Sequence, residues 1–177
     1  MNICTTERLT LRQFTLDDAP FILELLNDPA YIQNISDKGV RTIEDARGYI
    51  HNGPIASYQR FGFGLYLVLL RETGVSLGMC GLIKRDTLPD VDIGFAFLPQ
   101  YRANGYAFEA ASAVMAYGRD VLKLERIIAI VSPNNNDSIK LLLKLGLKFD
   151  RMIQWADDGS ELKLFVSPAP HSSFLNI

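Results

Sequence analysis

Histidine and cysteine are scarce in this sequence, with two of each among its 177 residues. His51 and His171 are isolated, and Cys4 and Cys80 lack the close spacing of a zinc or iron–sulfur motif. The sequence therefore predicts no metal site. We interpret both cysteines as free thiols in a reducing compartment, with Cys80 packed in the core.

A strong excess of either charge is also absent. Lysine and arginine number 18 against 20 aspartates and glutamates, which gives a net charge of −2. Proteins that bind nucleic acids or anionic membranes usually carry clustered positive charge. We therefore expect neither nucleic acid nor membrane as a partner.

Long apolar segments are missing as well. The longest clearly apolar run, residues 65–70, is far shorter than the roughly 20 residues that span a bilayer. The N-terminal residues lack the basic-then-apolar pattern of a secretory signal. These features favour a cytoplasmic protein.

Apolar residues suffice for a sizeable core, at 48% of the chain against 21% charged residues. The length fits one domain, with a core at about residues 6–167 and a loosely held tail at 168–177.

Residue periodicity and capping patterns predict an α/β fold: a mixed sheet with helices on its faces. A long helix between the strands at 91–98 and 126–132 makes those two strands parallel. Gly78 and Gly81 indicate a bulge or a close backbone approach. The predicted strands are 8–14, 61–71, 76–84, 91–98, 126–132, 147–155 and 161–167. Helices are predicted to start at Thr15 and Thr42, before a long one that reaches about Leu122, and again after Asn135, while 31–41 forms a loop or short helix.

The stretch at residues 91–111 indicates an anion site. Its apolar strand ends by Pro99, which cannot donate to a sheet ladder, and a helix begins after Gly105. The first N–H groups of a helix have no intrahelical partner and lie at its positive end. Gly105 permits a tight bend and close approach of a phosphate, and Arg102 adds a permanent cation.

Two motifs carry a family resemblance. R-A-N-G-Y-A at 102–107 resembles the R/Q-x-x-G-x-G/A loop of the GNAT (Gcn5-related) N-acetyltransferases. N-N-D-S-I-K-L-L-L-K-L-G-L at 135–147 is similar to the family's N-x-x-[AS]-x-x-x-x-x-K-x-G-F helix. E-R-L-T-L-R and D-I-G-F-A-F-L-P look like the branch of the ribosomal-protein alanine N-acetyltransferases. The resemblance implies a mostly antiparallel sheet of about seven strands, with a splayed parallel pair in the middle and helices on both faces.

The resemblance also implies acetyl-CoA as co-substrate, with its pantetheine arm between the strands that end at Leu98 and Ser132. Backbone groups of Phe97 and Leu98 would pair with the arm, and Asn135 would bind it from the other side. The pyrophosphate would lie on N–H groups of the loop: Arg102, Ala103, Asn104, Gly105, Tyr106 and Ala107.

The acceptor amine would attack the thioester directly, with a strand N–H near residues 95–97 stabilising the oxyanion. Asp92 is the candidate general base. Leu142 stands where the family often has a tyrosine that protonates the thiolate, and Ser138 is the nearest polar substitute. A thiol is a tolerable leaving group, so a dedicated acid is not essential.

Simpler interpretations exist for the same residues. The sequence also fits Arg102 as a solvated surface charge and Asp92 as a salt-bridge partner. It equally fits Asn135 and Ser138 as helix-cap residues. Glu109 fits the helix dipole alone, and His51 fits a structural or surface role. The aromatic residues Tyr31, Tyr58, Phe61 and Trp155 fit either an acceptor pocket or the core.

Three functions are compared. The leading one is N-acetyl transfer to a primary amine, either a peptide or protein N-terminus or a small amine such as a polyamine, amino acid or aminoglycoside-like compound. The second is an acyl-CoA-binding module without turnover, suggested by Leu142. A dinucleotide oxidoreductase is disfavoured because no G-x-G-x-x-G follows an early strand. Both a monomer and a homodimer fit the sequence.

Overall fold

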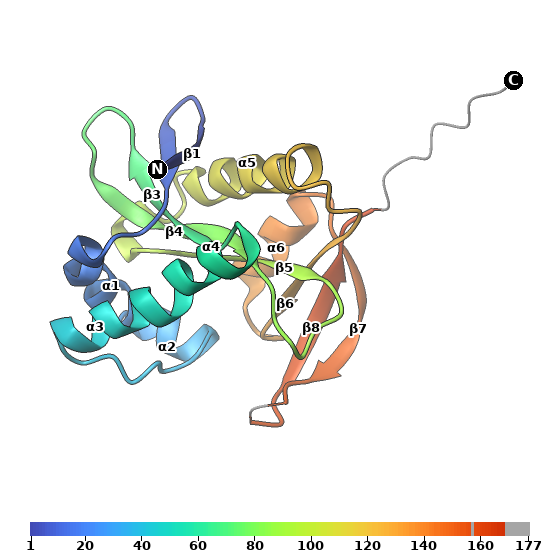
Figure 1. Ribbon diagram of the computed structural model, residues 1–177. Coiled ribbons are helices and arrows are strands. Elements are labelled where there is room, and N and C mark those ends of the chain that lie inside the picture. The colour runs from blue at the N-terminus through green and yellow to red at the C-terminus, as the bar shows by residue number, and fades with distance from the viewer. Residues whose placement is uncertain (157, 169–177) are drawn as a thin grey trace, which may run out of the picture.

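The computed structural model describes residues 1–156 and 158–168. One sheet of eight strands runs through them in the order β1-β2-β3-β4-β5-β6-β8-β7 (Figure 1). Its strands are β1 Asn2–Thr5, β2 Leu9–Arg12, β3 Leu65–Leu70, β4 Ser76–Ile83, β5 Val91–Phe97, β6 Ile127–Val131, β7 Lys148–Gln154 and β8 Glu161–Val166. The single domain stays a prediction, and the expected tail lies outside the described residues beyond Pro168.

Helices flank the sheet on both faces (Figure 1). They are α1 Ala19–Leu26, α2 Pro29–Asn34, α3 Ile43–Ile50, α4 Ala56–Phe61, α5 Tyr106–Asp120 and α6 Asn136–Lys144. A π-helical turn, His51–Ile55, joins α3 to α4, and short 3-10 turns occupy Leu16–Asp18 and Pro99–Tyr101. None of the described helices is long and apolar enough to cross a membrane.

The expected count of about seven strands was one too low. The strand that sequence analysis missed is β1, which pairs antiparallel with β2 at the edge of the sheet, from Asn2 opposite Arg12 to Thr5 opposite Thr10. A four-residue segment with little apolar alternation carries almost no strand signal of its own. Pairing to a neighbouring strand stabilises it instead.

Two other boundaries differ from expectation. Residues 29–34 form α2, within a region expected to be polar loop or short helix, because Pro29 suits the first turn of a helix and Asp28 caps it. The strand expected from residue 61 begins only at Leu65, since α4 continues to Phe61. Gly62, with φ of 80°, ends that helix in the left-handed conformation.

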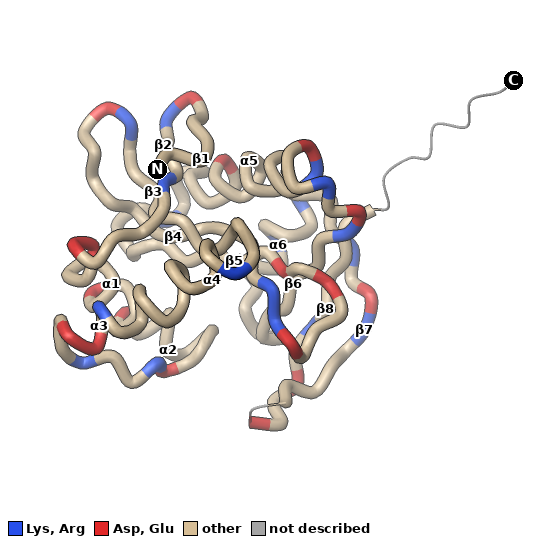
Figure 2. The backbone as a smooth tube through the Cα atoms, viewed as in Figure 1, with Lys and Arg blue, Asp and Glu red and all other residues tan. Residues whose placement is uncertain are grey.

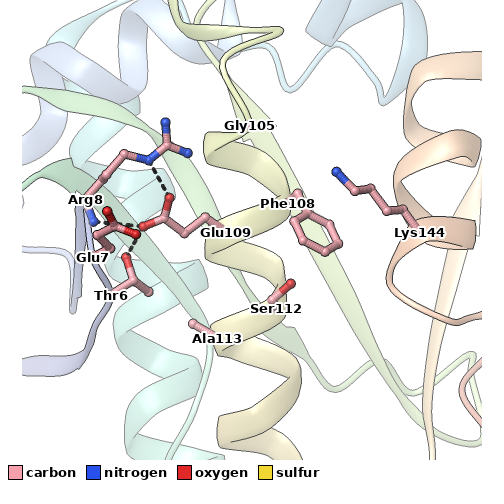
Figure 3. A pocket seen from close by; sticks show the side chains of 9 residues that line it. All are labelled: Thr6, Glu7, Arg8, Gly105, Phe108, Glu109, Ser112, Ala113 and Lys144. Carbon is pink, nitrogen blue, oxygen red and sulfur yellow. Dashed lines mark hydrogen bonds and ion pairs between the residues drawn. The ribbon is translucent and has the colours of Figure 1, made fainter.

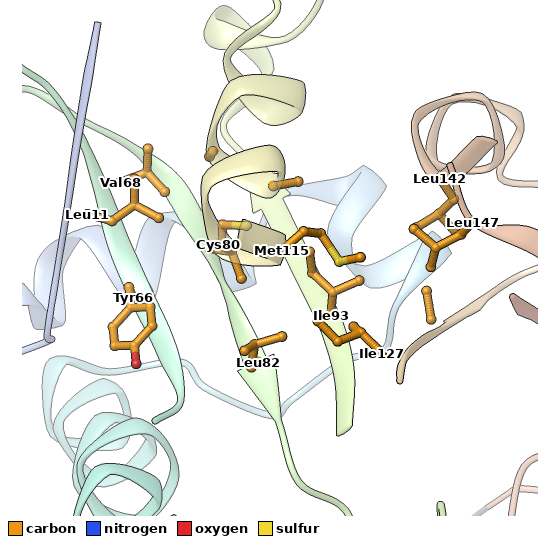
Figure 4. Packing of buried hydrophobic residues seen from close by; sticks show 14 of the residues in the cluster. Leu11, Tyr66, Val68, Cys80, Leu82, Ile93, Met115, Ile127, Leu142 and Leu147 are labelled. Atoms are coloured by element: carbon orange, nitrogen blue, oxygen red, sulfur yellow. The ribbon is translucent and has the colours of Figure 1, made fainter. Parts of the chain in front are cut away.

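Alternate side chains of the strands point to opposite faces of the sheet and pack in two separate cores. Tyr66, Cys80 and Ile93 lie in the core under α5 and α6, shown in Figure 4. Leu67 and Met79 lie in the core under α1 and α3. The sheet is thus a wall between two helical layers, and Cys80 is buried as expected.

The glycines of β4 confirm the predicted close backbone approach. A Cβ at Gly81 would lie 2.1 Å from the carbonyl oxygen of Gly64, and one at Gly78 would lie 2.4 Å from that of Ala96. The β3–β4 register also shifts between Val68 and Leu69. These contacts leave no room for a side chain at either glycine.

The strands β5 and β6 form the one parallel pairing among the described strands, which confirms the prediction that they run parallel. It consists of Val91 opposite Ile127 and Asp92 opposite Ile128, and no further pairing follows. Beyond Asp92 the two strands therefore part, and β5 loses its partner on that side.

Candidate functional site

The free edge of β5 exposes backbone groups toward the opening between β5 and β6. The N–H of Leu98 donates to the carbonyl of Leu77, 3.0 Å away, and so points toward β4. Because successive residues of a strand direct their backbone groups to opposite edges, those of Phe95 and Phe97 point toward the opening. The expectation for Phe97 fits this geometry, whereas the N–H of Leu98 is already bound within the sheet.

Arg102 lies just after this edge, but its side chain turns back into the protein. Its Nε donates to the carbonyl of Phe97, 3.0 Å away, and its Nη2 forms an ion pair with Asp28. Asp28 is 8% exposed and also caps α2 by accepting from the N–H of Tyr31. Two of the three guanidinium nitrogens are therefore engaged by protein groups, while Nη1 donates to no described residue and the side chain is 41% exposed.

The loop after Arg102 forms a concave row of N–H groups. Ala103 and Gly105 adopt positive φ of 58° and 78°, which turns successive N–H groups to one side. Among the residues described, the N–H groups of 103–108 donate no hydrogen bond, and the first helical bond of α5 runs from Glu109 to Gly105. With the positive end of a 15-residue helix behind it, this row can bind an anion.

The cation beside this loop is Arg8, which sequence analysis did not single out. Its Nη1 donates to the carbonyl of Asn104 at 3.0 Å, and its Cζ lies 4.5 Å from the centre of the Tyr106 ring. Its Nε pairs with Glu109 at 2.7 Å, and Thr6 donates to the same carboxylate. Glu109 thus joins the β1–β2 turn to α5, a role beyond the helix dipole that the sequence suggested.

Figure 3 shows the cleft of about 590 Å³ along this side of α5. Arg8 and Glu109 bound it at one end, and Lys144 reaches from α6 toward Phe108, with Nζ 4.2 Å from the ring centre. The remaining lining residues are Thr6, Glu7, Gly105, Ser112 and Ala113. The cleft adjoins the anion loop through Gly105.

Polar groups lie at the start of α6, just after β6 ends. Asn135 caps this helix, its Oδ1 accepting from the N–H of Ser138 at 3.2 Å. The cap is confirmed, and the Asn135 amide nitrogen and the Ser138 hydroxyl make no hydrogen bond with described residues. Leu142, 1% exposed, packs in the core under α5.

Asp92 sits where β5 and β6 part, at the closed end of the opening. It is 1% exposed, and its Oδ1 accepts from Nε of Arg85 at 2.9 Å. Burial raises the pKa of Asp92 above that of an ordinary aspartate, although the charge and hydrogen bond of Arg85 lower it. A carboxylate in this state accepts a proton more readily than an exposed one, which suits a general base.

Arg85 is the second residue that sequence analysis missed. It follows β4, and its Cζ lies 5.4 Å from the centre of the Trp155 ring, beyond β7. Tyr31 of α2 and Tyr49 of α3 lie close enough for Arg85 to affect them: burial raises the pKa of both tyrosines, and the Arg85 charge opposes this. No local sequence pattern connects Arg85 with Trp155, Tyr31 and Tyr49, because the four residues come from separate parts of the chain.

The opening therefore has two chemically different ends. Asp92 lies at the closed end, and the anion loop follows the last residue of β5. At about 3.3 Å per residue, the six steps from Asp92 to Leu98 place Asp92 roughly 20 Å from the end of the extended segment that leads to the loop. A ligand bound at its anionic end by the loop must be long and extended to reach Asp92.

The remaining sequence-predicted residues lie outside this opening. His51 is exposed and contacts Asn52, which confirms a surface role. Tyr58 stacks on Tyr66 and packs with Phe61 against the core under α5. Among the described residues, no three histidine, cysteine, aspartate or glutamate side chains gather as a metal site requires.

The profile of the acetyltransferase (GNAT) domain family matches residues 8–148 of this chain. The N-acetyltransferase YnaD of Bacillus subtilis is 32% identical over 144 residues, which cover 81% of this chain and 81% of YnaD. The chain belongs to the GNAT acetyltransferase family. It is an N-acetyltransferase, and the sequence resemblance is confirmed.

Solved GNAT structures share its fold. A GNAT acetyltransferase from Bacillus anthracis is 28% identical, with a TM-score of 0.77 over 94% of this chain and 97% of that one. RimL, a ribosomal L7/L12 α-N-protein acetyltransferase solved in complex with coenzyme A, has a TM-score of 0.80 at 16% identity, over 94% of this chain and 97% of that one.

Proposed function

We propose that this GNAT protein transfers the acetyl group of acetyl-CoA to a primary amine by direct attack on the thioester, within the opening between β5 and β6. The observation that carries the proposal is the row of N–H groups at residues 103–108, unbonded within the described chain, at the end of that opening. Such a row can bind a pyrophosphate, and the roughly 20 Å from Asp92 to Leu98, which precedes the loop, suits an extended pantetheine arm.

The coenzyme would be held mainly by backbone groups. The loop N–H groups bind the pyrophosphate, and the Phe95 and Phe97 groups pair with the amides of the arm as an added strand would. Asn135 reaches the arm from the β6 side. Arg102 supports the loop through Phe97 and Asp28 instead of contacting phosphate.

Asp92 would act on the acceptor amine at the other end. A free α-amine has a pKa of about 8 and is mostly protonated at neutral pH, so it must lose a proton before it attacks. Asp92 accepts that proton, directly or through water. The neutral amine then bonds to the thioester carbon, and its nitrogen loses a second proton to solvent as the carbon–sulfur bond breaks. The thiolate takes up a proton from solvent, directly or relayed through the Ser138 hydroxyl. A β5 N–H stabilises the oxyanion.

The acceptor class is proposed from the same site. An α-amine of a peptide or protein N-terminus is supported by the sequence resemblance, and RimL, similar in fold, acts on such an amine. Small amines are the alternative. A cytoplasmic location and a monomeric or homodimeric state stay predictions.

Two glycine variants test the coenzyme site. Gly105→Asp places a carboxylate in the anion loop, whereas Gly39→Asp places one at a glycine of similar φ, 68°, with open space around it. We expect Gly105→Asp to raise the Kd for CoA by about tenfold or more, measured by calorimetry, because a carboxylate repels the pyrophosphate. The Gly39→Asp control should stay within about twofold.

Thiol release from acetyl-CoA, followed against a panel of peptides, amino acids and polyamines, tests the transfer itself. Acetylation of at least one amine is expected. CoA binding without turnover on any amine would refute the transfer, and equal CoA affinity of Gly105→Asp and wild type would refute the loop as its site.

A further inference from the structure

Arg85 lies on the face of β5 that carries Asp92. Asp92 points to the same face of β5 as Ala96, which packs with the helices α1 and α3, because alternate residues share a face. Arg85 contacts Asp92 on this face and reaches Trp155, and its charge is felt by Tyr31 and Tyr49. About a third of its side chain, 32%, stays exposed to solvent.

The guanidinium is only partly used by the protein. Nε donates to Asp92, while Nη1 and Nη2 of Arg85 donate no hydrogen bond to any described residue. The second oxygen of Asp92, Oδ2, accepts none from any other described residue, in a side chain that is 2% exposed. Two hydrogen-bonding groups without a partner among the other described residues therefore lie side by side: the Nη1 and Nη2 donors of Arg85 and the Oδ2 acceptor of Asp92.

These two hydrogen-bonding groups attract different parts of a ligand. Oδ2 attracts an ammonium or amine, and the Nη1–Nη2 edge matches one or two oxygens of a carbonyl or carboxylate. The Trp155 ring, whose centre lies 5.4 Å from Cζ, adds a cation–π contact with the guanidinium. A compound with an amine and a carbonyl on the same carbon satisfies both. A polyamine offers no oxygen and brings further positive charge toward Arg85.

We propose that Arg85 determines acceptor specificity: its Nη1 and Nη2 bind the carbonyl or carboxylate oxygen next to an α-amine while Nε holds Asp92 beside that amine. Free amino acids and peptide N-termini share this chemistry, and polyamines lack it. This role for Arg85 rests on the proposed function and narrows its acceptor class.

The test compares the wild type with Arg85→Met and Arg85→Lys on four amines. Alanine and an alanyl tripeptide carry the oxygen, ethylamine is alanine without its carboxylate, and spermidine is a polyamine. Arg126→Met is the matched control, since Arg126 also pairs with an aspartate, Asp90, at 2.7 Å. Arg85→Lys keeps a positive charge beside Asp92 and so guards against a folding defect.

We expect the wild-type kcat/KM for alanine or the tripeptide to exceed that for ethylamine by about 100-fold, as a charge-assisted pair provides. Both Arg85 variants should reduce this ratio by about tenfold or more, with the acetyl-CoA KM within about twofold. The control should keep the wild-type ratio. A preference for alanine over the tripeptide identifies a carboxylate as the bound group, and the reverse identifies a peptide carbonyl.

Fluorescence of Trp155, the single tryptophan of the chain, reports binding without turnover. In the presence of CoA, alanine or the tripeptide should change this fluorescence in the wild type and not in Arg85→Met. That result, without acetyl transfer, would support Arg85 and refute the proposed reaction. An unchanged ratio in both Arg85 variants, or a preference for spermidine, would overturn the role of Arg85.

Discussion

Arg102 is bound to Asp28, so one guanidinium joins the end of β5 to the beginning of α2. The same group donates to the carbonyl of Phe97, and Asp28 also accepts from the N–H of Tyr31. The Arg102–Asp28 ion pair therefore links the segment after β5, which leads into the proposed coenzyme loop, to the helix that carries Tyr31.

Removing either partner of this link should destabilise the protein and weaken coenzyme binding. Asp28→Ala loses the α2 cap and the pair with Arg102, and we expect the free energy of unfolding to fall by about 2 kcal/mol in denaturant titrations. Arg102→Ala should raise the CoA Kd because Phe97 and the loop lose support. The double variant should be less destabilised than the sum of the singles. If Arg102→Ala weakens CoA binding while Asp28→Ala does not, Arg102 contacts phosphate itself.

Asp92→Asn should lower kcat by roughly 10²- to 10⁴-fold, the usual contribution of a general base, with little change in the CoA Kd. In the wild type, kcat/KM should fall on the acid side at a higher pH than an ordinary aspartate would give, because burial raises the pKa of Asp92. Arg85→Met should move that acid limb to still higher pH, since the Arg85 charge opposes the rise. A limb that stays in place would refute Asp92 as the titrating group.

The raised pKa of Asp92 should also make the free energy of unfolding depend on pH. Between the pKa of Asp92 in the unfolded chain and its raised pKa in the fold, the native state binds more protons. Stability should therefore fall as pH rises through this window, by linkage. Asp92→Asn should flatten that slope in pH-dependent thermal unfolding, and an unaltered slope would show that other groups dominate it.

Ser138→Ala should lower kcat by less than about tenfold, because a thiol with a pKa near 8.5 leaves without a dedicated acid. Leu142→Tyr should not raise kcat, since Leu142 faces the core under α5, and the larger side chain should cost about 1–3 kcal/mol of stability. Steady-state kinetics together with thermal unfolding check both variants. A rise in kcat for Leu142→Tyr would place this position at the thiolate after all.

Gly81→Ala should be among the most destabilising single changes in the sheet, at about 3 kcal/mol or more, because the new Cβ would meet the Gly64 carbonyl at 2.1 Å. The control is Gly48→Ala in α3, where nothing lies within 4 Å and φ is not positive. That change should stabilise the protein by about 0.5–1 kcal/mol. Denaturant midpoints measure both, and similar midpoints would mean that β4 can move away from β3.

Several parts of the site followed from short segments of sequence. The strand, loop and helix around Gly105 could be read locally, because proline, glycine and helix-start preferences act over a few residues. The Asn135 cap is local for the same reason. The parallel β5–β6 pair followed from one helix between two apolar strands. β1 was missed because a four-residue edge strand depends on its neighbour for stability.

Side-chain partners were decided only by the tertiary structure. The sequence predicted Arg102 as a phosphate ligand, and the fold adds a partner that no local pattern indicated: Asp28, the residue that caps α2. Arg85 had no motif, and gained a role only because the fold places it between Asp92 and Trp155. Backbone preferences are encoded over a few residues, whereas ion pairs and buried charges depend on which elements the packed sheet brings together.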